Sequence, residues 1–227
     1  MNKTHKNLAM VIHDIKNSFN TPISGLNFLI KEYSNLTDRE IITDLKEIKT
    51  NLERDHNYYT KLLEIFKLED QKIYSPSYLN LNSIVNDSYN FLRSQFENKS
   101  VVFENKIPEK QFVYSDPNLT HILLMNLLGN AVKYSYNKGI VSVQGKIIGN
   151  SYETSVIDNG VGISGEKLET LFDNYQNSEE GTRGETGTGL GLVHCKYLVE
   201  LQKGKIYVES LPNKGSKFSF TLPLKEK

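Results

Sequence analysis

The sequence has little of what marks several classes of protein. Its 227 residues include a single cysteine, Cys195, which excludes an internal disulfide framework and fits a reducing compartment. It has no run of about 18 apolar residues that could span a membrane, and its N-terminus lacks the apolar core of a signal peptide. The 27 basic and 27 acidic side chains cancel, so no global field favours nucleic acid or an acidic membrane surface. We therefore expect a cytoplasmic protein that binds neither nucleic acid nor a membrane.

Apolar residues recur at spacings of three and four through residues 1–68, which is the pattern of helices that pack in a bundle. The pattern breaks at 33–38, where Thr37 and Glu40 have the spacing of a capping box that starts a second helix. These features predict a helical hairpin with arms of about 30 residues, each about 45 Å long. Because such a hairpin has a thin core, we expect it to form a four-helix bundle with a second copy of the chain.

Residues 69–79 are polar, include Pro76 and are typical of a linker, after which helical and strand-like patterns mix. Helices are predicted near 81–97, 117–136, 165–172 and 189–202. Strands are predicted near 101–105, 111–114, 139–148, 151–157, 204–210 and 216–222. A hairpin turn is expected at Gly149 and Asn150. The mixture predicts an α+β domain, with a mixed sheet and helices on one of its faces.

Three polar side chains, Asn126, Asn130 and Lys133, share one face of the helix predicted at 117–136, opposite an apolar face. Mg²⁺ keeps most of its water ligands and takes few protein oxygens, so an asparagine carbonyl is a suitable ligand, while the ammonium suits phosphate oxygens. The stripe is therefore a candidate site for hydrated Mg²⁺ and phosphate groups. A plain solvated helix face is the alternative.

The segment IDNGVGI at 157–163 ends a predicted strand with an acid, Asp158, which Gly160 and Gly162 follow. A short acid in this position can accept a hydrogen bond from an amine such as the adenine amino group, and the glycines let the backbone approach a flat ring. An ordinary turn is the other interpretation, because Asp-Asn-Gly is a favoured turn sequence. The residues alone do not decide between the two.

The segment GETGTGLGL at 184–192 is a glycine-rich loop that opens a predicted helix. Gly187, Gly189 and Gly191 free backbone N–H groups to face an anion at the helix N-terminus, where the macrodipole adds to the attraction. The segment follows no predicted strand and lacks Gly-Lys-Ser/Thr, so it is neither a dinucleotide fingerprint nor a P-loop. A flexible loop is the alternative. The polar stretch 171–185 before it has the length and composition of a mobile lid over a ligand.

Taken in order, these segments resemble the four boxes of the sensor histidine kinases, which have a GHKL-type (Bergerat) ATP-binding fold. Their order and spacing are far more specific than any single glycine motif, and the resemblance covers the chain from about residue 8 to residue 224. The nucleotide-binding residues that it implies are Asn126, Asn130, Lys133 and Tyr134 (N box), Asp158, Gly160 and Gly162 (first glycine box), Phe172 (F box), and Gly187, Thr188, Gly189, Leu190 and Gly191 (second glycine box). Asn130 is the expected Mg²⁺ ligand.

The segment around His13 resembles the H box of the same family. Taken alone, a single histidine on a helix is usually a surface or satisfied residue. The resemblance implies that His13 accepts the γ-phosphoryl group of ATP, that Asp14 acts as general base, and that Asn17 orients water for dephosphorylating a response regulator. Ile12 and Ile15 lie on the apolar seam, so His13 lies off it. A neutral surface amide is the alternative interpretation of Asn17.

The sequence departs from the family pattern at three points. Many members have a proline five residues after the histidine. This chain has Ser18 there and a proline at Pro22, which would displace the helix bend by about one turn. Asn174 stands at the usual F-box proline, and residues 202–204 are Gln-Lys-Gly where His-Gly-Gly is usual. None of these changes removes a predicted phosphate or metal ligand.

The resemblance implies a two-domain α+β protein: a dimerisation and phosphotransfer hairpin at 1–68, a linker at 69–79 and an α/β-sandwich ATP-binding domain at 80–227. Such a histidine kinase core uses ATP and Mg²⁺, forms a homodimer through residues 1–68 and passes its phosphoryl group to the receiver domain of a response regulator. Two alternatives stay open, namely a non-catalytic histidine phosphotransfer scaffold and another ATPase of the same nucleotide fold.

The hairpin is predicted to begin within about ten residues of Met1, which leaves no room in this chain for an input domain before it. We therefore expect either the cytoplasmic part of a longer, membrane-bound receptor or a short soluble kinase that is regulated in trans.

Overall fold

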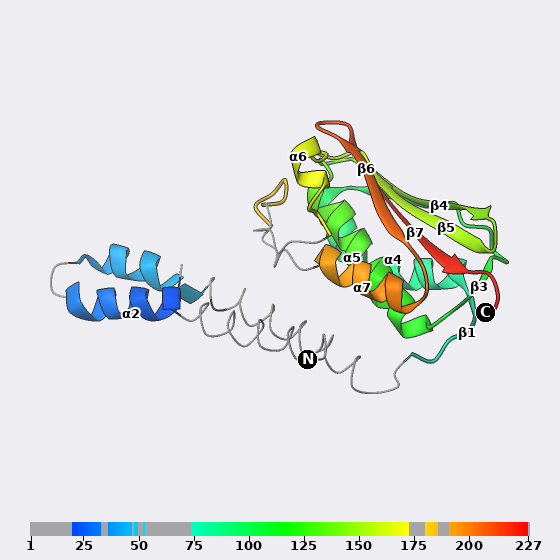
Figure 1. Ribbon diagram of the computed structural model, residues 1–227. Helices are drawn as coiled ribbons and strands as arrows, with labels where there is room; N and C mark the ends of the chain where they lie inside the picture. The colour runs from blue at the N-terminus through cyan, green and yellow to red at the C-terminus, as the bar shows by residue number, and fades with distance from the viewer. Residues whose placement is uncertain are drawn as a thin grey trace, which may run out of the picture. The chain divides into compact units, whose positions relative to one another are not determined.

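The computed structural model describes residues 20–32, 36–46, 48–49, 52, 74–172, 180–185 and 191–226 (Figure 1). The chain divides into two compact units, Met1–Lys67 and Leu68–Lys227. None of the helices within the described ranges is long and apolar enough to cross a membrane.

The first unit contains α2 (Asn20–Glu32) and a second helical stretch that begins at residue 38. The Thr37 amide donates a hydrogen bond to the Glu40 carboxylate at 2.8 Å, and the Glu40 amide donates to the Thr37 hydroxyl oxygen at 3.4 Å. Two backbone amides at the N-terminus of the second helix, those of Thr37 and Glu40, are thereby each hydrogen-bonded to the side chain of the other residue. The predicted capping box is confirmed.

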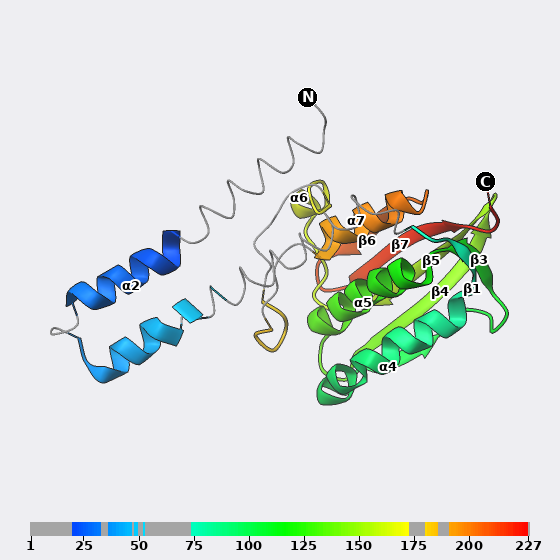
Figure 2. The same cartoon turned by 90° about the horizontal axis from the view of Figure 1, so that it is seen from below.

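The two helical stretches of this unit pack against each other through a glycine. A side chain on Gly25 would come within 3.0 Å of Ile48 Cδ1, so the stretches are in close contact at this point (Figures 1 and 2). Within the described part of the unit, the buried apolar side chains are Leu29 and Ile48, each 8% exposed. Several large apolar side chains remain more than half exposed, namely Ile23, Phe28, Ile30 and Ile42.

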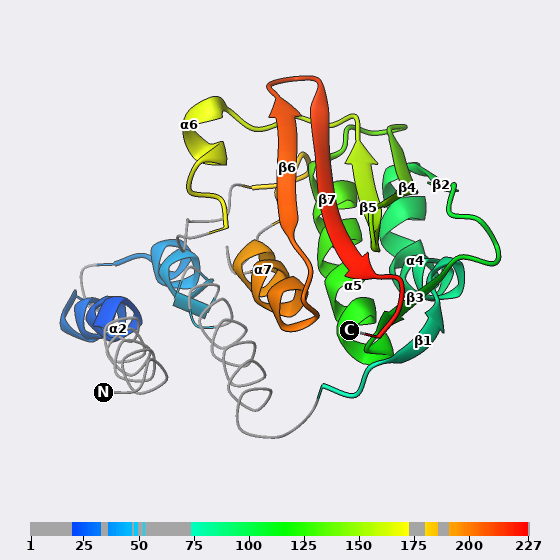
Figure 3. The same cartoon turned by 45° about the vertical axis from the view of Figure 1, so that its right-hand side comes forward.

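The second unit is built on a mixed sheet whose described strands run in the order β2-β4-β5-β7-β6 (Figure 3). These strands are β2 (Val102–Asn105), β4 (Ile140–Ile148), β5 (Ser151–Asp158), β6 (Ile206–Leu211) and β7 (Gly215–Pro223). β2 and β4 are parallel, and the other neighbouring pairs are antiparallel. The β4–β5 hairpin turns at the predicted place, where Gly149 has a φ of +57° that favours glycine.

Three helices, α4 (Leu81–Lys99), α5 (Pro117–Tyr134) and α7 (Gly191–Leu201), cover one face of this sheet (Figure 2). α5 is in contact with both of the others, and its apolar face lies in the core. The fully buried leucines of that face are Leu123, Leu124, Leu127 and Leu128. The predicted mixed sheet with helices on one face is confirmed for this unit.

The start of α5 is fixed by Asp116. Its Oδ1 accepts hydrogen bonds from the amides of Asn118 at 2.9 Å and Leu119 at 3.1 Å, and Pro117 occupies the first turn. Its Oδ2 accepts from the Ser75 amide at 2.8 Å. The register of the helix, and with it the position of the polar stripe, is set at this end.

The predicted linker is wrong at its C-terminal end, because β1 (Ser77–Asn80) lies there and pairs with β3 (Phe112–Ser115) in antiparallel fashion. The rings of Tyr78 and Tyr114 meet edge to face at 5.2 Å, and Leu79 is buried. The polar sequence around Pro76 hides this strand, because its pairing partner lies far along the chain.

The helix predicted at 165–172 is also too long. α6 (Gly165–Leu168) is a single turn that begins without a side-chain cap from Ser164. The chain then turns, and Leu171 and Phe172 pack against the core. Both side chains are partly buried there, outside a regular helix.

Candidate nucleotide-binding site

The polar stripe of α5 lies against the start of α7. The Asn126 side-chain amide donates to the Ile122 carbonyl at 2.9 Å, which fixes the orientation of the amide group. A side chain on Gly191 would come within 3.2 Å of Asn126 Oδ1 and 3.9 Å of Asn130 Nδ2. The structure therefore brings the two predicted metal-site amides together with the last glycine of the predicted phosphate loop.

Lys133 and Tyr134 close the stripe at the end of α5. Lys133 Nζ lies 4.7 Å from the centre of the Tyr134 ring, which is within the range of a cation–π contact. The Tyr134 carbonyl accepts a hydrogen bond from the Val161 amide at 3.2 Å. The end of the helix is thus joined to the first glycine segment.

Asp158, at the end of β5, is a buried carboxyl group with 6% exposure. Its Oδ1 accepts hydrogen bonds from the amides of Gly160 at 2.9 Å and Ser216 at 3.2 Å. Burial raises the pKa of Asp158 to about 6, against the opposing effect of these two hydrogen bonds. A buried, polar-lined carboxyl with a displaced pKa is a frequent feature of ligand sites.

The glycines after Asp158 allow close contact between backbone segments. A Cβ on Gly160 would lie 2.1 Å from the Tyr134 carbonyl oxygen, and one on Gly162 would lie 2.0 Å from the Leu211 carbonyl oxygen. Gly162 also has a φ of +67°, which side chains disfavour. In the structure these glycines let the turn fit against the ends of α5 and β6, a role within the protein that the sequence pattern did not show.

Phe172 packs at the edge of the core. Its ring meets that of Phe218 edge to face, with 6.4 Å between the ring centres. This contact fixes the chain at the N-terminal end of the predicted lid.

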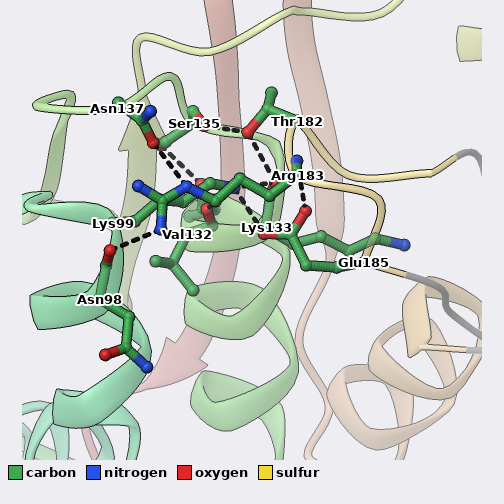
Figure 4. Close-up of polar contacts among 10 residues, drawn as sticks. Asn98, Lys99, Val132, Lys133, Ser135, Asn137, Thr182, Arg183 and Glu185 are labelled. Atoms are coloured by element: carbon green, nitrogen blue, oxygen red, sulfur yellow. Dashed lines mark hydrogen bonds and ion pairs between the residues drawn. The ribbon is translucent and has the colours of Figure 1, made fainter.

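The C-terminal end of the predicted lid is held in place. Residues 181–185, termed here the anchor segment, bond to the ends of α4 and α5 (Figure 4). The interaction that sequence reasoning missed is an ion pair between Lys99, which is 2% exposed, and Glu185 at 2.7 Å. Lys99 follows Leu92 and Phe96 on the buried face of α4, so its position in the helical pattern was the available signal.

Several predicted site residues lie outside the described residues. They are His13, Asp14, Asn17, Gly187, Thr188, Gly189 and Leu190.

Residues 115–226, which include all the predicted nucleotide-binding residues, match the family described as "Histidine kinase-, DNA gyrase B-, and HSP90-like ATPase". The adaptive-response sensory kinase SasA of Nostoc sp. strain PCC 7120 is 28% identical over 227 residues, which cover 96% of this chain and 56% of the relative. SasA of Rippkaea orientalis is 36% identical over 136 residues, which cover 58% of this chain and 34% of the relative. The chain contains a sensor histidine kinase catalytic core.

Solved structures resemble this kinase core. The catalytic domain of histidine kinase ThkA has a TM-score of 0.58 at 25% identity, and the match covers 66% of this chain and 96% of that domain. Histidine kinase ThkA in complex with the response regulator protein TrrA shares the fold, with a TM-score of 0.70 at 21% identity over 97% of this chain and 61% of that one. The chain spans about half the length of the curated relatives it matches, with 56% coverage of the Nostoc protein.

Proposed function

We propose that this chain is a protein-histidine kinase core that transfers the γ-phosphoryl group of ATP to His13 and then to an aspartate on the receiver domain of a response regulator. The observation that carries the proposal is the junction of the buried Asp158 carboxyl, the end of α5 and the start of α7 in a domain of this ATPase family. Similarity to SasA kinases supports it, as does the ThkA complex, in which a histidine kinase is bound to a response regulator.

In this proposal Asp158 accepts a hydrogen bond from the adenine amino group, because it is a buried acceptor beside a tight glycine turn. Lys133 and the backbone of the glycine-rich segment 187–191 hold phosphate groups. Tyr134 and Phe172 pack beside the nucleotide.

Asn130, assisted by Asn126, would hold Mg²⁺. The donors fit this ion, since both amides are partly exposed and can share it with water and phosphate oxygens. Among the described residues no group of three or more His, Cys, Asp or Glu side chains could hold a metal, so these amides are the better candidates. When bound, Mg²⁺ would neutralise charge on the phosphate groups.

In the transfer step a ring nitrogen of His13 attacks the γ-phosphorus, the bond from that phosphorus to the β–γ bridging oxygen breaks, and ADP leaves. Asp14 accepts the ring proton. In the phosphatase reaction, Asn17 orients a water molecule that hydrolyses the phosphoryl group from the response regulator. The roles of these three residues rest on the sequence resemblance.

Homodimerisation through residues 1–68 is part of the same proposal. Ile23 and Ile30 are seven residues apart on one face of α2 and are 51% and 76% exposed. Ile42, on the second helical stretch, is 52% exposed. Burying these apolar side chains against two helices of another chain would be favourable, and a second copy of this unit would complete a four-helix bundle.

The deciding experiment is autophosphorylation with γ-labelled ATP and Mg²⁺, scored as acid-labile and base-stable label. The parent chain is compared with His13→Ala, and His56→Ala serves as the matched histidine control from the same unit. We expect label on the parent and on His56→Ala, none on His13→Ala, and transfer from the labelled parent to a receiver domain.

Each other result contradicts a definite part of the proposal. Label that survives in His13→Ala would identify another acceptor. ATP binding without any label would contradict the kinase activity of this chain. Absence of both ATP binding and label would favour a phosphotransfer scaffold.

A further inference from the structure

Lys99 provides the central contact of the anchor segment, residues 181–185. Its ammonium donates to the Val132 carbonyl at 2.9 Å, to the Lys133 carbonyl, and to the Glu185 carboxylate at 2.7 Å (Figure 4). All three possible donor positions of the ammonium are therefore occupied. The Glu185 carboxylate also accepts from the Arg183 amide at 2.8 Å.

The ion pair suits its surroundings. Lys99 is the last residue of α4, and its ammonium group lies at the C-terminal end of α5. The last carbonyls and the macrodipole of α5 attract a cation there. A buried ammonium still needs a counter-charge, which Glu185 supplies. Burial opposes ionisation of Glu185, but its hydrogen bonds with Lys99 and the Arg183 amide outweigh burial and lower its pKa. The Glu185 carboxylate is therefore ionised at neutral pH.

Further bonds tie the anchor segment to the same two helix ends. The Thr182 hydroxyl donates to the Ser135 carbonyl at 2.7 Å. The Arg183 guanidinium donates to the Asn137 side chain at 2.9 Å and to the Asn98 carbonyl at the end of α4. The side chains of Thr182 and Arg183 thus bond outward to the helix ends, while the Lys99 side chain bonds inward to the segment.

The anchor segment is in contact with Lys133, the residue proposed to bind phosphate. The Lys133 carbonyl accepts from Lys99 and from the Thr182 amide at 3.2 Å. A side chain on Gly181 would come within 2.7 Å of Lys133 Cγ and 2.3 Å of Glu185 Oε2. The backbone of Gly181 therefore packs between the Lys133 side chain and the Glu185 carboxylate.

We propose that Lys99 and Glu185 are positioning residues for nucleotide binding, whose ion pair holds Lys133 where phosphate groups bind. The inference rests on the proposed ATP site and is independent of transfer to His13.

The test compares the full chain with Glu185→Gln, which keeps the size of the side chain and removes its charge. Glu97→Gln is the matched control, because Glu97 pairs with Arg93 on α4 at the same 2.7 Å, but with both side chains more than half exposed. ATP affinity is measured with Mg²⁺ by calorimetry, together with KM and kcat for autophosphorylation. We expect Kd and KM for ATP to rise about ten-fold in Glu185→Gln. In the control they should change by less than about two-fold.

Because the pair positions the nucleotide without touching the reacting atoms, kcat at saturating ATP should change by less than about three-fold in Glu185→Gln. Lys99→Met, which removes the ammonium and keeps an unbranched side chain, should shift Kd in the same direction. The Kd values are compared at a temperature well below the unfolding midpoint of each variant, so that loss of folded protein does not change the measured affinity.

An unchanged Kd in Glu185→Gln, with or without a lower unfolding midpoint, would overturn the inference and leave the pair a structural role. An equal effect in Glu97→Gln would also overturn it. If the parent binds ATP but does not label His13, the proposed kinase function fails, while the comparison of Kd values still decides this inference. If the parent binds no ATP, both fail.

Discussion

A buried carboxyl group such as that of Asp158 is unfavourable to the folded state while it is ionised. Its pKa is raised from 3.8 to about 6, so the folded protein holds this proton over a pH range in which the unfolded chain has lost it. As pH rises through that window, the group lowers the free energy of unfolding. An acid at this position therefore lowers the free energy of unfolding at neutral pH, as expected for a side chain whose charge serves to bind a ligand.

Asp158→Asn should separate ligand binding from stability. The asparagine carbonyl can still accept from the Gly160 and Ser216 amides, but it carries no charge to be penalised by burial. We expect the free energy of unfolding at neutral pH to rise by about 2 kcal/mol, with the gain disappearing below about pH 4. Urea unfolding as a function of pH measures this, and a gain that is independent of pH would contradict the assignment.

The same variant should bind ATP at least about ten-fold more weakly, because the charged acceptor is lost. In the parent chain, affinity should fall as pH drops below about 6, where Asp158 takes up its proton. Calorimetric titration across this range is the measurement. Unaltered affinity in the variant would remove Asp158 from the adenine contact.

Single residues differ in how far the sequence reveals them. Asn126, Asn130 and Asp158 could be proposed from short local patterns, because each lies in a motif with its own spacing. Lys99 could not be paired with Glu185 in this way, since the two are far apart in the chain, Lys99 belongs to no motif, and the glycine-rich pattern around Glu185 indicates no partner for its side chain. Long-range ion pairs depend on tertiary packing, which local patterns do not show.

At the scale of secondary structure, the cap at the start of α5 controls the helix that carries the polar stripe. Asp116 accepts three backbone hydrogen bonds, from Ser75, Asn118 and Leu119. Strands β2 to β7 and the long helices of this unit lie close to their predicted ranges, because their apolar periodicity is strong. β1 was missed because the sequence around it is polar and its pairing partner, β3, lies far along the chain.

Asp116→Ala should lower the free energy of unfolding by about 2 kcal/mol, because three buried or partly buried amides lose their acceptor. Asp116→Asn should recover part of this, since its carbonyl oxygen can still accept. Chemical unfolding of the full chain measures the effect. Asp87→Ala, at an exposed acid of α4, is the control, and an equal loss there would contradict a specific role for the cap.

At the scale of the whole molecule, the exposed apolar side chains of the first unit predict association. Ile23→Asp combined with Ile30→Asp should convert a dimer of two 25.9 kDa chains to a monomer. The reason is that a charge at a buried helix–helix seam is strongly unfavourable. Light scattering coupled to size-exclusion chromatography gives the mass.

Ile147→Asp is the matched control, because Ile147 is 63% exposed but lies in β4 of the second unit. We expect it to remain dimeric. A parent chain that is monomeric at all concentrations would contradict the proposed four-helix bundle.

The place of β7 in the sheet has a consequence for how the protein is made. β7 follows every other strand in the chain, yet it lies between β5 and β6, and in the described sheet β6 pairs with β7 alone. During synthesis β5 therefore keeps an open edge, and β6 has no partner, until β7 has left the ribosome. Open strand edges invite pairing with other chains. A nascent chain that stalls before β7 should thus be a target for chaperones, and folding of this domain should begin only after its last strand has been released.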